Sequence, residues 1–209
     1  MMPNAMVANA TLQTEAGNPL NQDRGAVIAY GSRQIFVIAD GAGGVAGGEE
    51  AAEFVVEFIR QNAALLDSSG SCVSTLQKMD HAVAQASNAG ETTCVIAVVG
   101  EDQVFGASVG DSGAWLIGEK AIDDLTRGQS RKPLIGSGGA RAVPYVRQTV
   151  GGEYLLLATD GLLKYTQAER IATVCRGWVT ELPTPRLVEL VRYPSGALPD
   201  DVTFILARL

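Results

Sequence analysis

Short apolar segments recur along this chain, and several are separated only by tight turns. In Val99-Gly100-Glu101-Asp102-Gln103 the turn leaves no room for a helix between two such segments. Because parallel neighbours need a crossover of about a dozen residues or more, this spacing predicts antiparallel hairpins. The segments expected to form strands are Gly25–Tyr30, Gln34–Ala39, Thr93–Val99, Gln103–Val109, Ala114–Ile117, Tyr154–Thr159 and Val202–Ala207.

Two pairs of helices are expected between these strands. Glu49–Leu66 and Val73–Ala89 carry apolar residues at helical spacing, and the shorter segments Gln167–Cys175 and Pro185–Val191 form a second pair. An amphipathic helix must bury its apolar face against another element. We therefore predict an α+β fold, a four-layer αββα sandwich of two antiparallel sheets, each flanked by a pair of helices.

The composition limits the classes of partner. The chain has 209 residues, 46% of them hydrophobic, and a net charge of −7. This size predicts a single domain over residues 1–209, and the acidic balance argues against binding to nucleic acid or to an anionic membrane. The three cysteines are far apart, so free thiols and a cytoplasmic location are expected. We also expect a monomer, with no secretion signal and no apolar run of the ~20 residues that span a membrane.

Three aspartates lie next to these apolar strand segments. Asp40 and Asp160 each follow one and precede a glycine, and Asp200 comes just before another. An apolar strand is usually buried, so a residue at its end lies on the rim of the core. Carboxylates that meet on one rim repel each other unless a cation offsets their charge. The pattern predicts a site for a hard divalent ion such as Mg²⁺ or Mn²⁺.

The glycine-rich stretch after Asp40 has two interpretations. Gly-Ala-Gly-Gly-Val-Ala between a strand and a helix resembles a dinucleotide-binding turn. Asp40 and the Glu49-Glu50 pair argue against that interpretation, because they place negative charge where a pyrophosphate would lie. In the second interpretation the glycines let the backbone wrap around an ion held by Asp40, with the Gly41 carbonyl as a further oxygen ligand. Only the second explains the aspartate.

The region from about 127 to 147 is rich in glycine and in basic residues, and it is predicted to be a mobile surface loop. Its basic side chains are either solvated or placed on the rim of a site that binds an anionic substrate. Both interpretations are compatible with the sequence.

The order of the motifs resembles the protein phosphatase 2C (PPM) family of metal-dependent serine/threonine phosphatases, in a compact bacterial form. The resemblance runs through nearly the whole chain. It is carried by Asn21-Gln22-Asp23, Ile38-Ala39-Asp40-Gly41-Ala42-Gly43-Gly44, Gly48-Glu49, Thr92-Thr93, Val109-Gly110-Asp111-Ser112, Leu156-Leu157-Ala158-Thr159-Asp160-Gly161 and Asp200-Asp201-Val202-Thr203.

The resemblance implies two divalent metal ions, Mn²⁺ or Mg²⁺, and a role for each matching residue. Asp40 would bridge the two ions, the Gly41 carbonyl would bind one, and Asp160 and Asp200 would hold the other. Asp40 and Asp160 would be catalytic through metal-bound water. A second tier comprises Gln22 and Asp23, acting through water, and Asp111, a candidate ligand for a third, weaker ion.

The chain departs from the family at a position that binds the substrate phosphate and at a position linked to a third metal ion. Asn18 stands where the family usually carries a phosphate-binding arginine, and Lys164 stands where some members have a further aspartate. The family's flap is reduced to the Gly-rich basic loop at about 127–147. The candidates for a replacement phosphate ligand are Arg131, Arg141 and Arg147.

These features lead to one expected function and one alternative. The expected function is metal-dependent hydrolysis of phosphoserine or phosphothreonine on a protein substrate, by a water activated between two divalent ions. The alternative is a catalytically weak regulatory module that binds a phosphoprotein partner. The missing arginine favours the alternative, whereas the retained carboxylates favour the enzyme.

Overall fold

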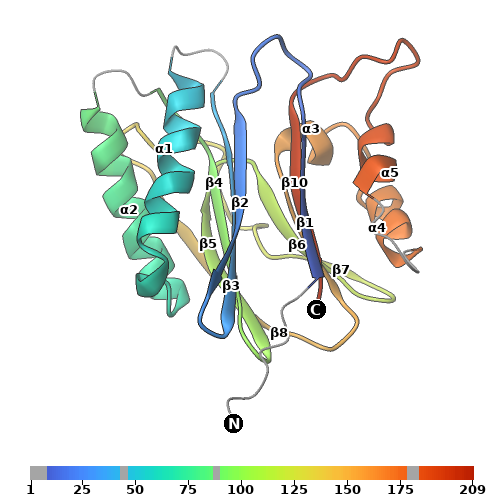
Figure 1. Ribbon diagram of the computed structural model, residues 1–209, viewed down its shortest axis with the longest axis horizontal. Helices are drawn as coiled ribbons and strands as arrows, with labels where there is room; N and C mark the ends of the chain where they lie inside the picture. Colours follow the sequence, from blue (N-terminus) through green and yellow to red (C-terminus); the bar gives the residue numbers. More distant parts are fainter. Residues whose placement is uncertain (1–8, 43–46, 87–89, 178–183) are drawn as a thin grey trace.

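Two five-stranded antiparallel sheets lie face to face in the computed structural model, which describes residues 9–42, 47–86, 90–177 and 184–209 (Figure 1). The first sheet has the order β2-β3-β4-β5-β8, and the second has the order β1-β10-β9-β6-β7. The strands of the first sheet are β2 (Asp23–Tyr30), β3 (Arg33–Asp40), β4 (Cys94–Val99), β5 (Gln103–Val109) and β8 (Val143–Gln148). Those of the second are β1 (Asn9–Glu15), β10 (Val202–Arg208), β9 (Tyr154–Ala158), β6 (Gly113–Ile117) and β7 (Ile122–Asp124).

Helices cover the outer face of each sheet, which gives the four predicted layers (Figure 1). On the first sheet lie α1 (Gly48–Gln61), the short 3-10 helix η1 (Ala63–Leu65) and α2 (Ser69–Gln85). On the second lie α3 (Asp160–Leu163), α4 (Ala168–Arg176) and α5 (Thr184–Glu189). Among the described residues, none of these helices is long and apolar enough to cross a membrane.

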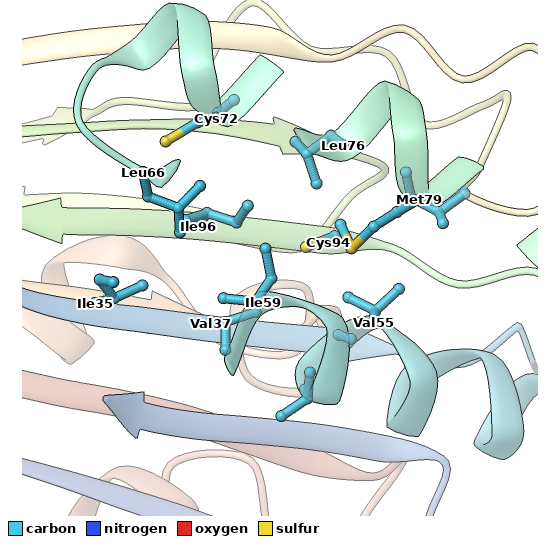
Figure 2. Close-up of a cluster of buried hydrophobic side chains, with 14 of the residues drawn as sticks. Ile35, Val37, Val55, Ile59, Leu66, Cys72, Leu76, Met79, Cys94 and Ile96 are labelled. Atoms are coloured by element: carbon cyan, nitrogen blue, oxygen red, sulfur yellow. The ribbon is translucent and has the colours of Figure 1, made fainter. Parts of the chain in front are cut away.

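The helix pair α1 and α2 packs on the first sheet through the apolar stripe that the sequence predicted. Val55 and Ile59 of α1 and Leu76 of α2 point toward Val37 and Ile96 of the sheet (Figure 2). All five side chains are buried. Burying one such side chain contributes about 1.5–3 kcal/mol, so this contact fixes the helices on the sheet.

A second core fills the space between the two sheets. Phe36 and Ile38 of β3 meet Leu155 and Leu157 of β9 and Ile205 of β10 there. Because β3 is covered by helices on one face and by the other sheet on the opposite face, its side chains are apolar without alternation. The buried strands bring Asp40, Asp160 and Asp200 toward the same end of the sandwich.

Three strands differ from the sequence-based expectation, because β1, β7 and β8 were not predicted as strands. Each of the three is an edge strand, so it is less buried and less apolar than the central strands. Pro144 within β8 opposes Ala107 of β5, and an edge strand tolerates a proline because one side of its ladder is unpaired. The expected loop at about 127–147 is therefore wrong over its last residues, which form β8.

The remainder of that segment is anchored and does not form a loose loop. The buried carboxylate of Asp80 in α2 accepts hydrogen bonds from the backbone N–H groups of Gly136 (2.8 Å), Gly138 (3.0 Å) and Ala140 (2.9 Å). Ile135 also forms an antiparallel bridge with Thr92. These contacts fix the path of the chain that follows Arg131.

Candidate active site

A cavity of about 280 Å³ opens at the end of the sandwich where the three predicted aspartates meet. Carboxylates and basic side chains line it together. Its lining residues are Asn18, Gln22, Asp40, Gly41, Ala42, Thr93, Asp111, Arg131, Lys132, Leu134, Asp160, Lys164, Asp200 and Asp201.

Asp40 lines the cavity from the last position of β3. Its direct cross-strand neighbour is Asp23, the first residue of β2. Like charges placed opposite each other in an antiparallel pair destabilise the sheet. A carboxylate pair at this position therefore needs either a proton or a cation close by.

Hydroxyl groups hold the backbone of Asp40 from the neighbouring strand. The Thr93 hydroxyl accepts the Asp40 N–H (3.0 Å), and the Thr92 hydroxyl donates to the Asp40 carbonyl (2.9 Å). Thr93 is linked in turn to the Ser112 hydroxyl at 2.7 Å. The side chains of Thr92, Thr93 and Ser112 are all buried. The network therefore fixes the backbone that carries the Asp40 carboxylate.

The glycines after Asp40 and Asp160 are required by close approaches of the backbone. A Cβ atom on Gly41 would lie 2.4 Å from the backbone of Gly48, at the start of α1. A Cβ atom on Gly161 would lie 1.8 Å from the carbonyl oxygen of Asp201. Each Asp-Gly step therefore lets a second chain segment pack directly against the rim of the cavity.

The second sheet supplies Asp160 and Asp200 from adjacent strands. Asp160 follows β9, Asp200 precedes β10, and β9 and β10 pair antiparallel. Thr159 joins the two segments, because its N–H donates to the Thr203 carbonyl (2.9 Å) and its hydroxyl accepts the Thr203 N–H (3.1 Å). The same hydroxyl donates to the buried carboxylate of Asp23 at 2.9 Å. This side chain thus connects the two sheets beneath the cavity.

Asp201 has a structural task, although it lines the cavity. One of its carboxylate oxygens accepts the N–H groups of Gly17 (2.9 Å) and Asn18 (3.0 Å), and the other accepts the N–H of Gln22 (3.0 Å). Three charge-assisted bonds hold the connection between β1 and β2. The Asn18 side chain donates to Asp200 at 3.1 Å, so the residue at the family's arginine position contacts a predicted metal ligand.

Two basic side chains that line the cavity contact carboxylates. Arg131 Nε lies 2.7 Å from Asp111 Oδ2, and Lys164 Nζ lies 3.6 Å from Asp160 Oδ2. Gln129 holds the turn that carries Asp111, because its amide donates to the carbonyls of Gly110 and Ser112.

The crowding of carboxylates raises their pKa values. Burial, followed by the charges of Asp23 and Asp160, raises the pKa of Asp40 to about 9. Burial raises the pKa of Asp23 to about 7, against the hydrogen bond from Thr159. The pKa of Asp160 is raised by burial and by Asp111, whereas Lys164 lowers it. Such a site favours the binding of a cation, because a cation stabilises the ionised carboxylates.

Most of the predicted site residues line this cavity, and three do not. Gln22, Asp40, Gly41, Asp111, Arg131, Asp160 and Asp200 line it. Asp23 is buried beneath it, and Arg141 and Arg147 lie away from it. Arg147 pairs with Asp123 of β7 instead. Gly43 and Gly44 of the glycine-rich motif lie outside the described residues.

Lys132 was missed as a lining residue, and the ion pair of Lys164 was not foreseen. Both had a weak signal in the sequence. Lys132 lies next to a candidate arginine, and Lys164 follows Asp160 by one helical turn.

The donor set suits hard divalent ions, because the side-chain donors along the cavity are oxygen atoms and carboxylates predominate. Within residues 9–42, 47–86, 90–177 and 184–209, no three acidic, histidine or cysteine side chains stand close enough to hold one ion by themselves. Ions such as Mg²⁺ keep several waters and need only one or two carboxylates each. The residues therefore fit ions that are bound largely through water, shared between Asp40, Asp160 and Asp200.

Comparisons with known proteins identify the family of this chain. A model of the protein phosphatase 2C family matches residues 13–133. The rice (Oryza sativa subsp. japonica) protein named "Probable protein phosphatase 2C 3" is 30% identical over 189 residues, which are 86% of this chain and 34% of the rice protein. The chain thus spans about a third of the length of that relative.

Solved structures share the fold over nearly the whole chain. The serine/threonine phosphatase Stp1 from Staphylococcus aureus matches with a TM-score of 0.83 at 22% identity, covering 100% of this chain and 98% of that one. The catalytic domain of the serine/threonine phosphatase PstP, solved in complex with two manganese ions, matches with a TM-score of 0.78 at 22% identity, covering 96% and 97%.

Proposed function

The chain belongs to the protein phosphatase 2C family, and on that premise we propose that it hydrolyses phosphoserine and phosphothreonine in a protein substrate with the help of two divalent ions. The observation that carries the proposal is the gathering of Asp40, Asp160 and Asp200 around one cavity. A module that only binds a partner has no need of a repulsive carboxylate cluster, which lowers stability. The manganese ions of PstP, a structural relative, support the choice of metal.

Asp40, Asp160, Asp200 and the Gly41 carbonyl are the proposed metal ligands, and Gln22 faces the same cavity as a contact through water. Divalent ions bound there would supply Lewis acidity toward the phosphoryl oxygens and would lower the pKa of water. Asp23 lies opposite Asp40 in the sheet, where its charge raises the pKa of Asp40 and its carboxylate accepts a hydrogen bond from the Thr159 hydroxyl. Trp, Cys and His side chains have no part in the proposed reaction.

Arg131 is the proposed ligand for the substrate phosphate. Its Nε atom lies 2.7 Å from Asp111 Oδ2, and the side chain lines the cavity while it stays largely exposed. A guanidinium held in this way can bind two phosphoryl oxygens at once. Of the three candidate arginines, Arg141 and Arg147 do not line the cavity.

Replacing Arg131 with alanine is expected to raise KM for a phosphothreonine peptide about 10-fold to 100-fold, because a hydrogen bond to a charged group contributes about 1.5–3 kcal/mol. The effect on kcat should be smaller, since the arginine binds the ground state as well. Arg141→Ala is the matched control, because Arg141 is exposed and lies outside the cavity. Equal KM values for the two variants would remove Arg131 from the substrate site.

A regulatory module that binds a phosphoprotein is the second candidate, and Asn18 favours it. The Asn18 amide contacts Asp200 and cannot replace a phosphate-binding guanidinium. The same peptide experiment separates the two candidates. An enzyme releases inorganic phosphate with turnover, whereas a module binds the phosphopeptide and returns it intact.

A further inference from the structure

Two of the carboxylates that line the cavity already have a basic partner in the chain. Asp111 pairs with Arg131 at 2.7 Å, and Asp160 pairs with Lys164 at 3.6 Å. The two pairs come from separate segments, since Asp111 follows β5, Arg131 lies in the segment before β8, and Asp160 and Lys164 belong to α3 and its C-terminal cap.

The two pairs form one charge cluster. All four side chains of the two pairs line the same cavity. Two negative and two positive groups thus line one cavity as two ion pairs, and their formal charges cancel.

A divalent ion between Asp111 and Asp160 would supply the same two positive charges. Such an ion would have to displace Arg131 and Lys164 or bind beside them and be repelled. Lys164 lies one helical turn after Asp160 and 5.3 Å from the Tyr165 ring, and Gln129 holds the turn that presents Asp111 to Arg131. Asp40 and Asp200, by contrast, have no ion pair among the described residues.

We propose that Arg131 and Lys164 are internal counter-ions that replace a third divalent ion at Asp111 and Asp160. The cavity then binds two ions, and Asp111 serves to position Arg131 and does not bind metal. The inference rests on the proposed metal-dependent function, and it predicts how the number of bound ions responds to substitution.

The test counts bound Mn²⁺ by titration calorimetry and by the paramagnetic resonance signal of free Mn²⁺. The wild-type protein is expected to bind two ions per chain. The double variant Arg131→Ala/Lys164→Ala is expected to bind three, because Asp111 and Asp160 lose their counter-ions. Both side chains are largely exposed, 71% for Arg131 and 53% for Lys164, so the substitutions should leave the fold intact. A far-ultraviolet spectrum and a melting curve verify that.

Lys132→Ala is the matched control, because Lys132 lines the same cavity and forms no ion pair with any described residue. It should bind two ions, like the wild type. Three ions in the wild type, or two in the folded double variant, would overturn the inference. A wild type that binds no ions would overturn both this inference and the proposed metal dependence. Two ions bound without any phosphate release would overturn the proposed function and leave the ion count supported.

Discussion

Replacing Asp40 with asparagine is expected to lower phosphate release by about 10³-fold or more, equivalent to roughly 4 kcal/mol of lost transition-state stabilisation. Asp40 lines the cavity, and its pKa is raised by burial and by the charges of Asp23, Asp160, Asp111 and Asp200. It is the carboxylate best placed to be shared between two ions. Asparagine keeps the shape and removes the charge, so the loss would come from metal binding.

The experiment compares kcat of the wild type and of Asp40→Asn for a phosphothreonine peptide at saturating Mn²⁺. Asp102→Asn serves as the control, because Asp102 is exposed in the turn between β4 and β5, remote from the cavity. The control should keep the wild-type rate. An Asp40→Asn variant that keeps more than about a tenth of the wild-type kcat would remove Asp40 from the catalytic centre.

The same substitution is expected to stabilise the metal-free protein. The folded protein raises the pKa of Asp40 from 3.8 to about 9, so folding favours the protonated carboxyl. The stability that Asp40 contributes is present below about pH 4 and is lost as the pH rises toward about 9. At about pH 7.5 the wild type has lost most of the stability that the protonated Asp40 contributes. The asparagine of the variant does not titrate, so the variant does not lose stability in this way. We expect Asp40→Asn to raise Tm without metal by about 5 °C, from a gain of about 1–2 kcal/mol.

With Mn²⁺ added, the wild type should melt at a higher temperature than Asp40→Asn. Saturation at about 100 times Kd contributes roughly 2.7 kcal/mol to a protein that binds one ion only when folded. The wild-type Tm should therefore rise by several degrees with Mn²⁺ and return with chelator, while the Asp40→Asn Tm changes little. Calorimetric melting at about pH 7.5 with and without Mn²⁺ measures both. A variant that melts below the wild type without metal would contradict the charge repulsion inferred for this site.

The central strands and the long helices could be predicted because their buried faces require apolar residues at a regular spacing. β3 is covered on both faces and is apolar throughout, and α1 presents an apolar stripe at helical spacing. The edge strands β1, β7 and β8 carry mixed side chains because water reaches part of their surface. Local pattern therefore fails at three of the four sheet edges, where pairing partners distant in sequence decide the structure, although it did predict most of the fourth edge strand, β2.

In the site, too, local patterns could be predicted and contacts between distant segments could not. The Asp-Gly steps at Asp40 and Asp160 are local patterns, and the sequence predicted that these residues come together. Asp201 accepts three N–H groups from residues about 180 positions earlier in the chain, and Asp80 accepts three from a segment nearly 60 positions later. No local pattern distinguishes such anchors from exposed aspartates. The cytoplasmic location, the monomeric state and the single domain stay predictions.

The most direct test of the proposed metal centre is the release of inorganic phosphate from a phosphothreonine peptide by chelated protein, by the same protein after Mn²⁺ is restored, and by Asp160→Asn with Mn²⁺. We expect release only by the wild type with Mn²⁺, since Asp160 lines the cavity beside Asp40 and Asp200. Equal release with and without chelator, or undiminished release by Asp160→Asn, would contradict a metal centre built from these carboxylates.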